Sequence, residues 1–248
     1  TTDQLEAAFT DKTKAIVLNS PSNPTGSVYT RQELTAIAEW AVQKNIWIIS
    51  DEIYDKLVYG DEEHVCMASL SPEVKARTIL INGVSKSYAM TGWRIGYFAA
   101  PTQVAQAVSR LQSHTTSNPT SISQYAAIEA FSMDQSVLNP MKAAFSTRRD
   151  LMVQTLQGIE GIQINQPSGA FYAFPKIEAL FGTTSAGGKN ITDSLSFCEA
   201  LLEEAQVACV PGIGFGAEGY MRLSYATSEQ VITEGLERIA AFVATLTR

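Results

Sequence analysis

Three chemically distinctive loops follow the first three apolar runs of the chain. The run AIVLN is followed by SPSNPTG, in which two prolines stiffen a turn that presents the Asn23 amide. The run IWIIS is followed by Asp51 and, three residues later, by Tyr54. The run TILING is followed by VSKSY, which contains Lys86. Taken singly, these features are better explained as a turn, a helix N-cap and a surface lysine.

The segment NGVSKSYAMTGWRIGYFAAP adds a second cation to this set. Lys86 and Arg94 lie eight residues apart, among glycines, Met90 and Trp93 and with no other charge, which favours a pocket over a solvated face. Ligands of open parallel sheets collect at the carboxyl ends of the strands. We therefore expect the amide, the carboxylate, the phenol and the amine to converge at one edge of one sheet.

This combination of groups suits pyridoxal phosphate. The cofactor needs an amine that condenses with its aldehyde, an anion that keeps its ring nitrogen protonated, and a cation for its phosphate. Lys86, Asp51 and Arg94 supply these three groups, and the charge of Asp51 favours the protonated ring. Tyr54 and Asn23 are expected to donate hydrogen bonds to the phenolic oxygen of the ring.

Elements that alternate between strand and helix are needed to position these residues. Strands are predicted at 15–19, 46–50, 78–83 and 94–100, and TRQE at Thr30 begins a helix over 31–44. The first two strands with this helix form a βαβ unit with a parallel pair. The fold class is therefore α/β, with a mostly parallel sheet.

The second half of the chain has a different order of predicted elements, with short strands between longer helices. A long helix is predicted over 140–156, followed by the short strands GIQIN, AFYAF, VACV and YMRLSYA and by helices at 191–205 and 228–247. FGTTSAGGKN is predicted to be a mobile loop, and Glu199, Glu203 and Glu204 a solvated helix face. We place the domain boundary near residue 145, so that 1–145 belongs to a cofactor-binding large domain and 146–248 forms a smaller α+β domain.

Composition excludes several classes of function. The 248 residues carry a formal charge of -7 and a pI near 4.9, with no basic run for a nucleic acid. Three dispersed cysteines and two histidines provide neither a disulfide framework nor a metal site. No apolar run is long enough to span a membrane, and the first residues lack the core of a signal peptide. We expect a cytoplasmic protein with no metal and no membrane contact.

The motifs SNPTG, DEIYD and SKSYAMTGWRIGY, in this order and spacing, resemble the class I aminotransferases of fold type I, and most closely the bacterial aspartate aminotransferases. The resemblance extends to MRLSYATS, whose family counterpart contains the arginine that grips the substrate carboxylate, here Arg222. It also includes SGAFYAFP, which points to Phe171 as a pocket residue. Many relatives carry a hydroxyl residue three positions before the lysine, where this chain has Gly83.

The resemblance implies a pyridoxal-phosphate enzyme that moves an amino group from an amino acid, aspartate or a similar one, to a 2-oxo acid. Lys86 would transfer the α-proton, and Arg222 would orient the substrate. It also implies a homodimer. In the family a third or more of the chain precedes the point at which this sequence starts, so we expect a partial large domain that a separate N-terminal segment could complete.

Two other functions stay open at this stage. The first is a carbon–sulfur lyase or related synthase of the same fold, which would use the same lysine and arginine. The second is a truncated fragment that keeps the motifs without turnover, because fold alone does not guarantee function.

Overall fold

The structure is a computed structural model that describes all residues, 1–248. The chain divides into two compact units. Unit 1 contains residues 1–22 and 27–139, and unit 2 contains residues 23–26 and 140–248. The short segment with Asn23 therefore belongs to unit 2, although its sequence neighbours belong to unit 1. The predicted assignment of 1–145 and 146–248 to two functional domains stays a prediction.

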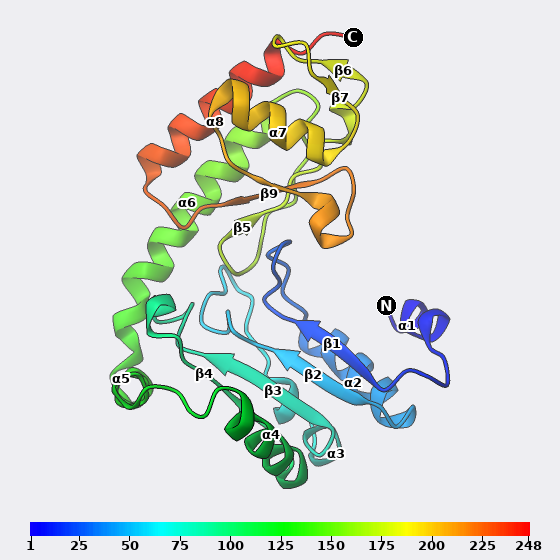
Figure 1. Cartoon of the computed structure of the whole chain (residues 1–248), viewed down its shortest axis with the longest axis vertical. Coiled ribbons are helices and arrows are strands. Elements are labelled where there is room, and N and C mark those ends of the chain that lie inside the picture. Colours follow the sequence, from blue (N-terminus) through cyan, green and yellow to red (C-terminus); the bar gives the residue numbers. More distant parts are fainter. The chain divides into compact units, whose positions relative to one another are not determined.

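A four-stranded sheet forms the centre of unit 1, in the order β1-β2-β3-β4 (Figure 1). The strands are β1 (Ala15–Asn19), β2 (Trp47–Asp51), β3 (Thr78–Gly83) and β4 (Gly96–Ala99). The first three are parallel, and β4 pairs antiparallel to β3. The predicted α/β class with a mostly parallel sheet is thus confirmed.

Helix α2 (Arg31–Gln43) completes the predicted βαβ unit. Its capping box is formed by Thr30 and Glu33: the Thr30 amide donates to Glu33 Oε2 over 2.8 Å, and the Glu33 amide donates to Thr30 Oγ1 over 3.2 Å. The apolar face of α2 packs with Leu18 and Ile48 from one face of the sheet. The short helix α1 (Thr2–Ala8) joins this side of the unit through Glu6, which accepts a hydrogen bond from the Trp40 indole.

The opposite face of the sheet is poorly covered. Strand register aligns Val17 with Ile49 and Ile49 with Ile79, which places these side chains on the face away from α2. Val17 is 68% exposed. A groove of about 520 Å³ lies along β3, β4 and helix α4 (Thr102–Thr115), and α4 has no buried residue. Unit 1 therefore exposes apolar side chains on this face of the sheet.

The remaining elements of unit 1 are short helices and α5. They are, in chain order, η1 (Met67–Ser69), α3 (Pro72–Lys75), η2 (Thr91–Trp93), α5 (Ser121–Ser132) and η3 (Gln135–Leu138). Helix α5 also exposes apolar side chains, including Tyr125 and Ile122. Its buried Ser123 binds the backbone of η2, since Ser123 Oγ donates to the Trp93 carbonyl over 2.8 Å.

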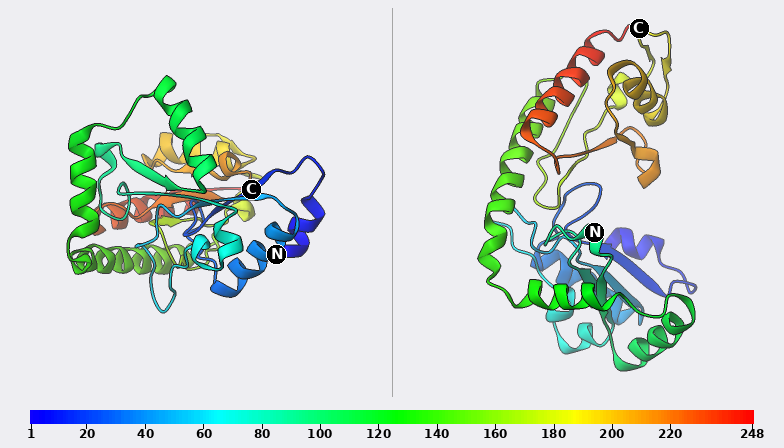
Figure 2. Two further views of the ribbon diagram at one scale, coloured as in Figure 1. Left: turned by 90° about the horizontal axis from the view of Figure 1, so that it is seen from below. Right: turned by 60° about the vertical axis from the view of Figure 1, so that its left-hand side comes forward.

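Unit 2 packs three helices against a small antiparallel sheet. The helices are α6 (Asn139–Gln157), α7 (Ser194–Ala205) and α8 (Glu229–Ala244), with the short η4 (Glu178–Leu180) and η5 (Gly212–Phe215) between them. The strands are β5 (Tyr172–Ala173), β8 (Val210–Pro211) and β9 (Met221–Ser224), in the order β5-β9-β8. Helices α6 and α8 lie side by side in both views of Figure 2. The predicted strand GIQIN is reduced to one bridge, between Gln163 and Lys176.

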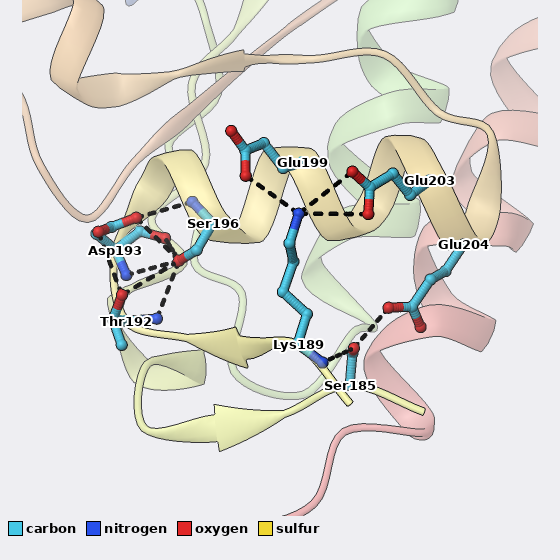
Figure 3. A network of polar contacts seen from close by, with 8 residues as sticks. All are labelled: Ser185, Lys189, Thr192, Asp193, Ser196, Glu199, Glu203 and Glu204. Carbon is cyan, nitrogen blue, oxygen red and sulfur yellow. Dashed lines mark hydrogen bonds and ion pairs between the residues drawn. The ribbon is translucent and has the colours of Figure 1, made fainter. Parts of the chain in front are cut away.

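Glu199, Glu203 and Glu204 are exposed on α7, as predicted, but the neighbouring segment contains more regular structure than its sequence indicated. The predicted mobile loop contains a hairpin of β6 (Thr183–Thr184) and β7 (Asn190–Ile191). The predicted solvated face of α7 holds this hairpin: Lys189 Nζ lies 3.1 Å from Glu199 Oε2 and 3.3 Å from Glu203 Oε2 (Figure 3). Glu204 accepts a hydrogen bond from the Gly187 amide, 3.0 Å away. The hairpin adds regular structure to the predicted loop, and the mobility of the segment stays a prediction.

None of the helices in this chain has the length and apolar character needed to cross a membrane.

Candidate active site

Asp51 is the last residue of β2 and marks the carboxyl end of the parallel strands. It is half-buried, and its Oδ1 accepts a hydrogen bond from the Ile53 amide, 3.2 Å away. The chain then forms successive tight turns, in which the Asp55 amide donates to the Glu52 carbonyl over 3.0 Å. These turns bury Tyr54, which is 3% exposed. The end of β2 therefore presents a carboxylate beside a buried phenol ring.

The environment of Asp51 favours a cation as its partner. Burial raises the pKa of the Asp51 carboxyl, the Ile53 amide lowers it to a smaller degree, and the negative charge of Glu52 raises it further. A carboxylate in this setting gains stability when a positive charge approaches it. A protonated ring nitrogen would provide that charge.

Lys86 lies in the loop after β3, where the Ala89 amide donates to the Lys86 carbonyl over 3.2 Å. Its Nζ is 5.9 Å from the centroid of the Tyr54 ring, within the range of a cation–π contact. The next residue fixes this loop, since Ser87 is fully buried and its Oγ donates to Asp55 Oδ1 over 2.9 Å. Unit 1 thus brings the predicted amine to the predicted phenol, and links both loops by a hydrogen bond that sequence analysis did not anticipate.

Arg94 lies just beyond η2 with a left-handed backbone, φ 53°. This conformation explains why β4 begins at Gly96 and not at the predicted residue 94. The Arg94 guanidinium is exposed and donates from Nη1 to the Thr91 carbonyl over 2.9 Å. An arginine has five N–H donors, so the remaining ones can bind an anion such as a phosphate.

Unit 2 assembles a separate group around Arg222 on β9. Arg222 Nη1 donates to Asn23 Oδ1 over 2.9 Å. The guanidinium carbon lies 4.6 Å from the centroid of the Tyr172 ring and 5.0 Å from that of Phe215. Two predicted residues, Asn23 and Arg222, are therefore direct neighbours, and the guanidinium is held between two aromatic rings.

Sequence analysis missed both of these rings. Tyr172 follows Phe171 in the segment SGAFYAFP. Its position next to a predicted pocket residue could have indicated that it contributes to the site. Phe215 lies in the glycine-rich segment PGIGFG, and no local pattern there indicates a contact with Arg222. Only the fold brings residue 215 to Arg222.

Phe171 belongs to an aromatic cluster of unit 2. Its ring stacks on Phe145 with centroids 5.6 Å apart and an interplanar angle of 28°, and it lies 4.7 Å from the Tyr172 ring. Tyr172 therefore contacts both the Phe171 ring and the Arg222 guanidinium. Its predicted role in the substrate pocket stays a prediction.

The residues of unit 1 fit pyridoxal phosphate by their chemistry. Asp51 has an environment that favours a cation, Lys86 provides an amine beside a buried ring, and Arg94 retains free donors for an anion. No residue present blocks the assignment. Glycine at position 83, where many relatives have a hydroxyl residue, suits this structure, because a Cβ at this position would lie 3.0 Å from the Gly96 Cα on the paired strand.

Comparison with known proteins identifies the family. The family model "Aminotransferase class I and II" matches residues 1–239. The chain therefore belongs to the class I and II aminotransferases, whose members use pyridoxal 5'-phosphate.

Individual relatives are similar over nearly the whole chain. An aspartate aminotransferase of a Bacillus species is 51% identical over 98% of this chain, and an aspartate/prephenate aminotransferase of Cereibacter sphaeroides is 49% identical over 99%. The crystal structure of an aspartate aminotransferase from Rhizobium meliloti superimposes with a TM-score of 0.96 at 43% identity and covers 100% of this chain. The chain spans only 61% of the Bacillus protein and 62% of each of the other two.

Proposed function

We propose that this chain is the larger part of a pyridoxal-phosphate-dependent aminotransferase. The observation that carries the proposal is the arrangement at the end of β2, where the half-buried Asp51 precedes a turn whose Tyr54 ring lies beside Lys86. Family membership supports the same chemistry. A lyase or synthase of the same fold would need the same groups, but the relatives named above are aminotransferases.

In this proposal, Lys86 holds the cofactor and Asp51 and Arg94 bind its two ends. Asp51 pairs with the protonated ring nitrogen, and Arg94 donates hydrogen bonds to the phosphate. The bound cofactor supplies an electron-accepting ring that stabilises negative charge at the substrate α-carbon. Once the amine of the substrate has replaced Lys86 on the cofactor, the freed Lys86 amine would accept the α-proton as general base and return it as general acid.

Arg222 binds the α-carboxylate of the substrate. Its planar guanidinium can donate two parallel hydrogen bonds to a carboxylate, which fixes the orientation of the α-carbon. The Asn23 amide and the rings of Tyr172 and Phe215 preorganise the guanidinium for this contact. Asn23 adds no negative charge, so the arginine keeps its charge for the substrate.

The proposed amino donor is aspartate or a similar amino acid, and the acceptor is a 2-oxo acid. The names of the relatives favour aspartate, and the name of the Cereibacter protein adds prephenate. We further propose a cytoplasmic homodimer, as the resemblance to bacterial aspartate aminotransferases implies.

The apolar face of unit 1 supports a further partner. Val17 and Ile81 are exposed on this face of the sheet, and Leu111 on α4 borders the groove that Ile81 lines. Exposed apolar side chains that gather on one face are typical of an interaction surface. In our proposal, an N-terminal segment of the kind found in the family covers this face and completes the large domain.

The first experiment records the absorbance of the purified chain with added pyridoxal phosphate, before and after borohydride reduction. Three proteins are compared: the unchanged chain, Lys86→Ala, and the matched control Lys56→Ala, which removes an exposed lysine. We expect a visible absorbance band in the unchanged chain and in the control but not in Lys86→Ala. Reduction should attach the cofactor to the peptide that contains Lys86, as detected by mass spectrometry.

Either of two results would contradict the proposal. One is a band of equal strength in the Lys86→Ala protein, and the other is attachment of the cofactor at a different lysine. Titration of the band with aspartate and with other amino acids then ranks the substrates.

A further inference from the structure

A buried carboxylate lies next to Asp51 and is not used by the proposed chemistry. Glu52 is 3% exposed, and three groups surround its side chain. Ser50 Oγ donates to Oε1 over 2.9 Å, the Met67 amide donates to the same oxygen over 2.9 Å, and His64 Nε2 lies 2.8 Å from Oε2. A carboxylate buried in this way is stable only when it is hydrogen-bonded.

The three contacts keep Glu52 ionised. Burial alone would raise the pKa of the Glu52 carboxyl, but hydrogen bonds from His64, the Met67 amide and Ser50 together lower it below its ordinary value. The second nitrogen of the imidazole, His64 Nδ1, is buried without a hydrogen-bond partner. The orientation of His64 therefore depends on Glu52.

These contacts tie the end of β2 to a segment that follows it in the sequence. The Glu52 amide donates to the Ile81 carbonyl over 2.9 Å, and this hydrogen bond belongs to the Asp51–Ile81 pair that ends the β2–β3 ladder. The Glu52 side chain then holds residues 64–67 on the core side, where Met67 is fully buried. Asp51, which accepts a hydrogen bond from the Ile53 amide, is thus flanked by backbone that Glu52 fixes.

We propose that Glu52 is a positioning residue for Asp51: its buried hydrogen bonds to His64 and to the Met67 amide hold the carboxyl end of β2 so that the Asp51 carboxylate faces the cofactor. The importance of Asp51 itself rests on the proposed function. The placement of Asp51 by Glu52 can be measured without any cofactor.

Several ionisable groups act in this cluster. Besides His64, the negative charge of Glu52 acts on the Asp51 carboxyl, on the Cys66 thiol and on the Tyr97 hydroxyl, whose pKa values lie above their ordinary ones mainly because of burial. The charge of Glu52 acts on the pKa values of its neighbours, whereas its hydrogen bonds act on the position of the backbone. Two variants of Glu52 separate these effects.

The test measures amide hydrogen exchange in the cofactor-free 248-residue chain, at the Ile53 and Met67 amides. Glu52→Ala removes all the contacts, and Glu52→Gln keeps an oxygen for Ser50 and the Met67 amide but removes the negative charge. Glu62→Gln is the matched control, because Glu62 is an exposed carboxylate in the same segment. The titration of the Asp51 carboxyl, followed by NMR, provides a second measure.

We expect Glu52→Ala to lower the protection of both amides by about tenfold or more. At about pH 7.5, Glu52→Gln should retain protection within about threefold, and it should lower the pKa of Asp51 because a neighbouring negative charge is gone. Glu62→Gln should match the unchanged chain.

The proposal is overturned if Glu52→Ala exposes the Met67 amide and leaves Ile53 protection and the Asp51 titration unchanged, since Glu52 would then hold only the 64–67 segment. If Glu52→Ala does not fold, Glu52→Asp decides, because it keeps the charge but draws the carboxylate back by one methylene from His64 and the Met67 amide, and Ile53 protection equal to that of the unchanged chain contradicts the proposal. Cofactor binding is scored separately: a chain that binds no pyridoxal phosphate counts against the proposed function, whereas the exchange data still decide the role of Glu52.

Discussion

Arg222 and Asn23 are 199 positions apart in the sequence, yet Arg222 Nη1 donates to Asn23 Oδ1 over 2.9 Å. The partner of the guanidinium is a neutral amide, whereas a structural arginine is commonly paired with a carboxylate. A neutral partner orients the arginine and leaves its charge available to an anion. This is the property that a carboxylate-binding residue needs.

Replacing the neutral partner with a charged one should therefore weaken substrate binding. We expect Asn23→Asp to form an internal ion pair with Arg222 and to raise the dissociation constant of a carboxylate substrate by about 10- to 100-fold, since charge-assisted hydrogen bonds contribute about 1.5–3 kcal/mol. Asn23→Ala, the control, should cost less than about tenfold. The measurement is a titration of the cofactor-loaded protein with a 2-oxo acid, and equal affinity in Asn23→Asp and the unchanged protein would count against a carboxylate site at Arg222.

The aromatic rings beside Arg222 should contribute as well. Phe215→Leu keeps apolar volume but removes one π face, so we expect carboxylate binding to weaken by about two- to thirtyfold, the equivalent of about 0.5–2 kcal/mol. Tyr172→Phe keeps the ring and serves as the control, with little change expected. The same titration measures both variants. A Phe215→Leu protein that binds as tightly as the control would show that the ring does not hold the guanidinium.

The sheet could be predicted from the sequence because its signals are local. The apolar runs of β1, β2 and β3 and the TRQE capping box specify strand and helix within a few residues, and the structure places β1 and β3 at the predicted bounds. The ends of elements were less certain. At Arg94, a left-handed backbone terminates the preceding turn and delays β4 to Gly96.

The supporting contacts of the site could not be predicted in this way. The hydrogen bonds from His64 to Glu52 and from Arg222 to Asn23 join residues that no local pattern connects. Their formation depends on how strands and loops pack, and a single sequence carries no signal for such pairs. The residue types were identified by chemistry and family resemblance, and their neighbours were not.

Asp51 should reduce the stability of the cofactor-free chain. Its pKa is raised, mainly by burial, so the folded state favours the protonated form. The favourable contribution of the protonated form is fully present below the ordinary pKa, near 3.9, and is lost as the pH rises through the higher folded-state pKa. At neutral pH, we expect Asp51→Asn to unfold at a higher denaturant concentration than the unchanged chain, and the difference should vanish at about pH 3.

The same variant should lose the benefit of the cofactor. Pyridoxal phosphate should raise the unfolding midpoint of the unchanged chain by mass action and that of Asp51→Asn much less. Denaturant titrations with and without cofactor at neutral pH measure both effects. A cofactor-free Asp51→Asn chain that is less stable than the unchanged one at neutral pH would show that Asp51 has a structural partner and is not held in an unfavourable environment for function.

The two faces of the sheet offer the sharpest test of the proposed N-terminal segment. Val17 and Ile48 lie on adjacent strands, but Val17 is 68% exposed and Ile48 is fully buried against α2. In the separate 248-residue chain, we expect Val17→Thr to change the free energy of unfolding by less than about 0.5 kcal/mol, and Ile48→Thr to cost about 2–4 kcal/mol. If a family-type N-terminal segment covers this face as proposed, Val17→Thr should cost about 1–2 kcal/mol in its presence. Denaturant unfolding of both variants, with and without the segment, measures these differences.

Ile48→Thr is the control, and it should cost the same with and without the segment because its neighbours are already present. If Val17→Thr also costs the same in both settings, the segment does not cover this face, and a partner of another kind must be sought for the apolar surface of unit 1.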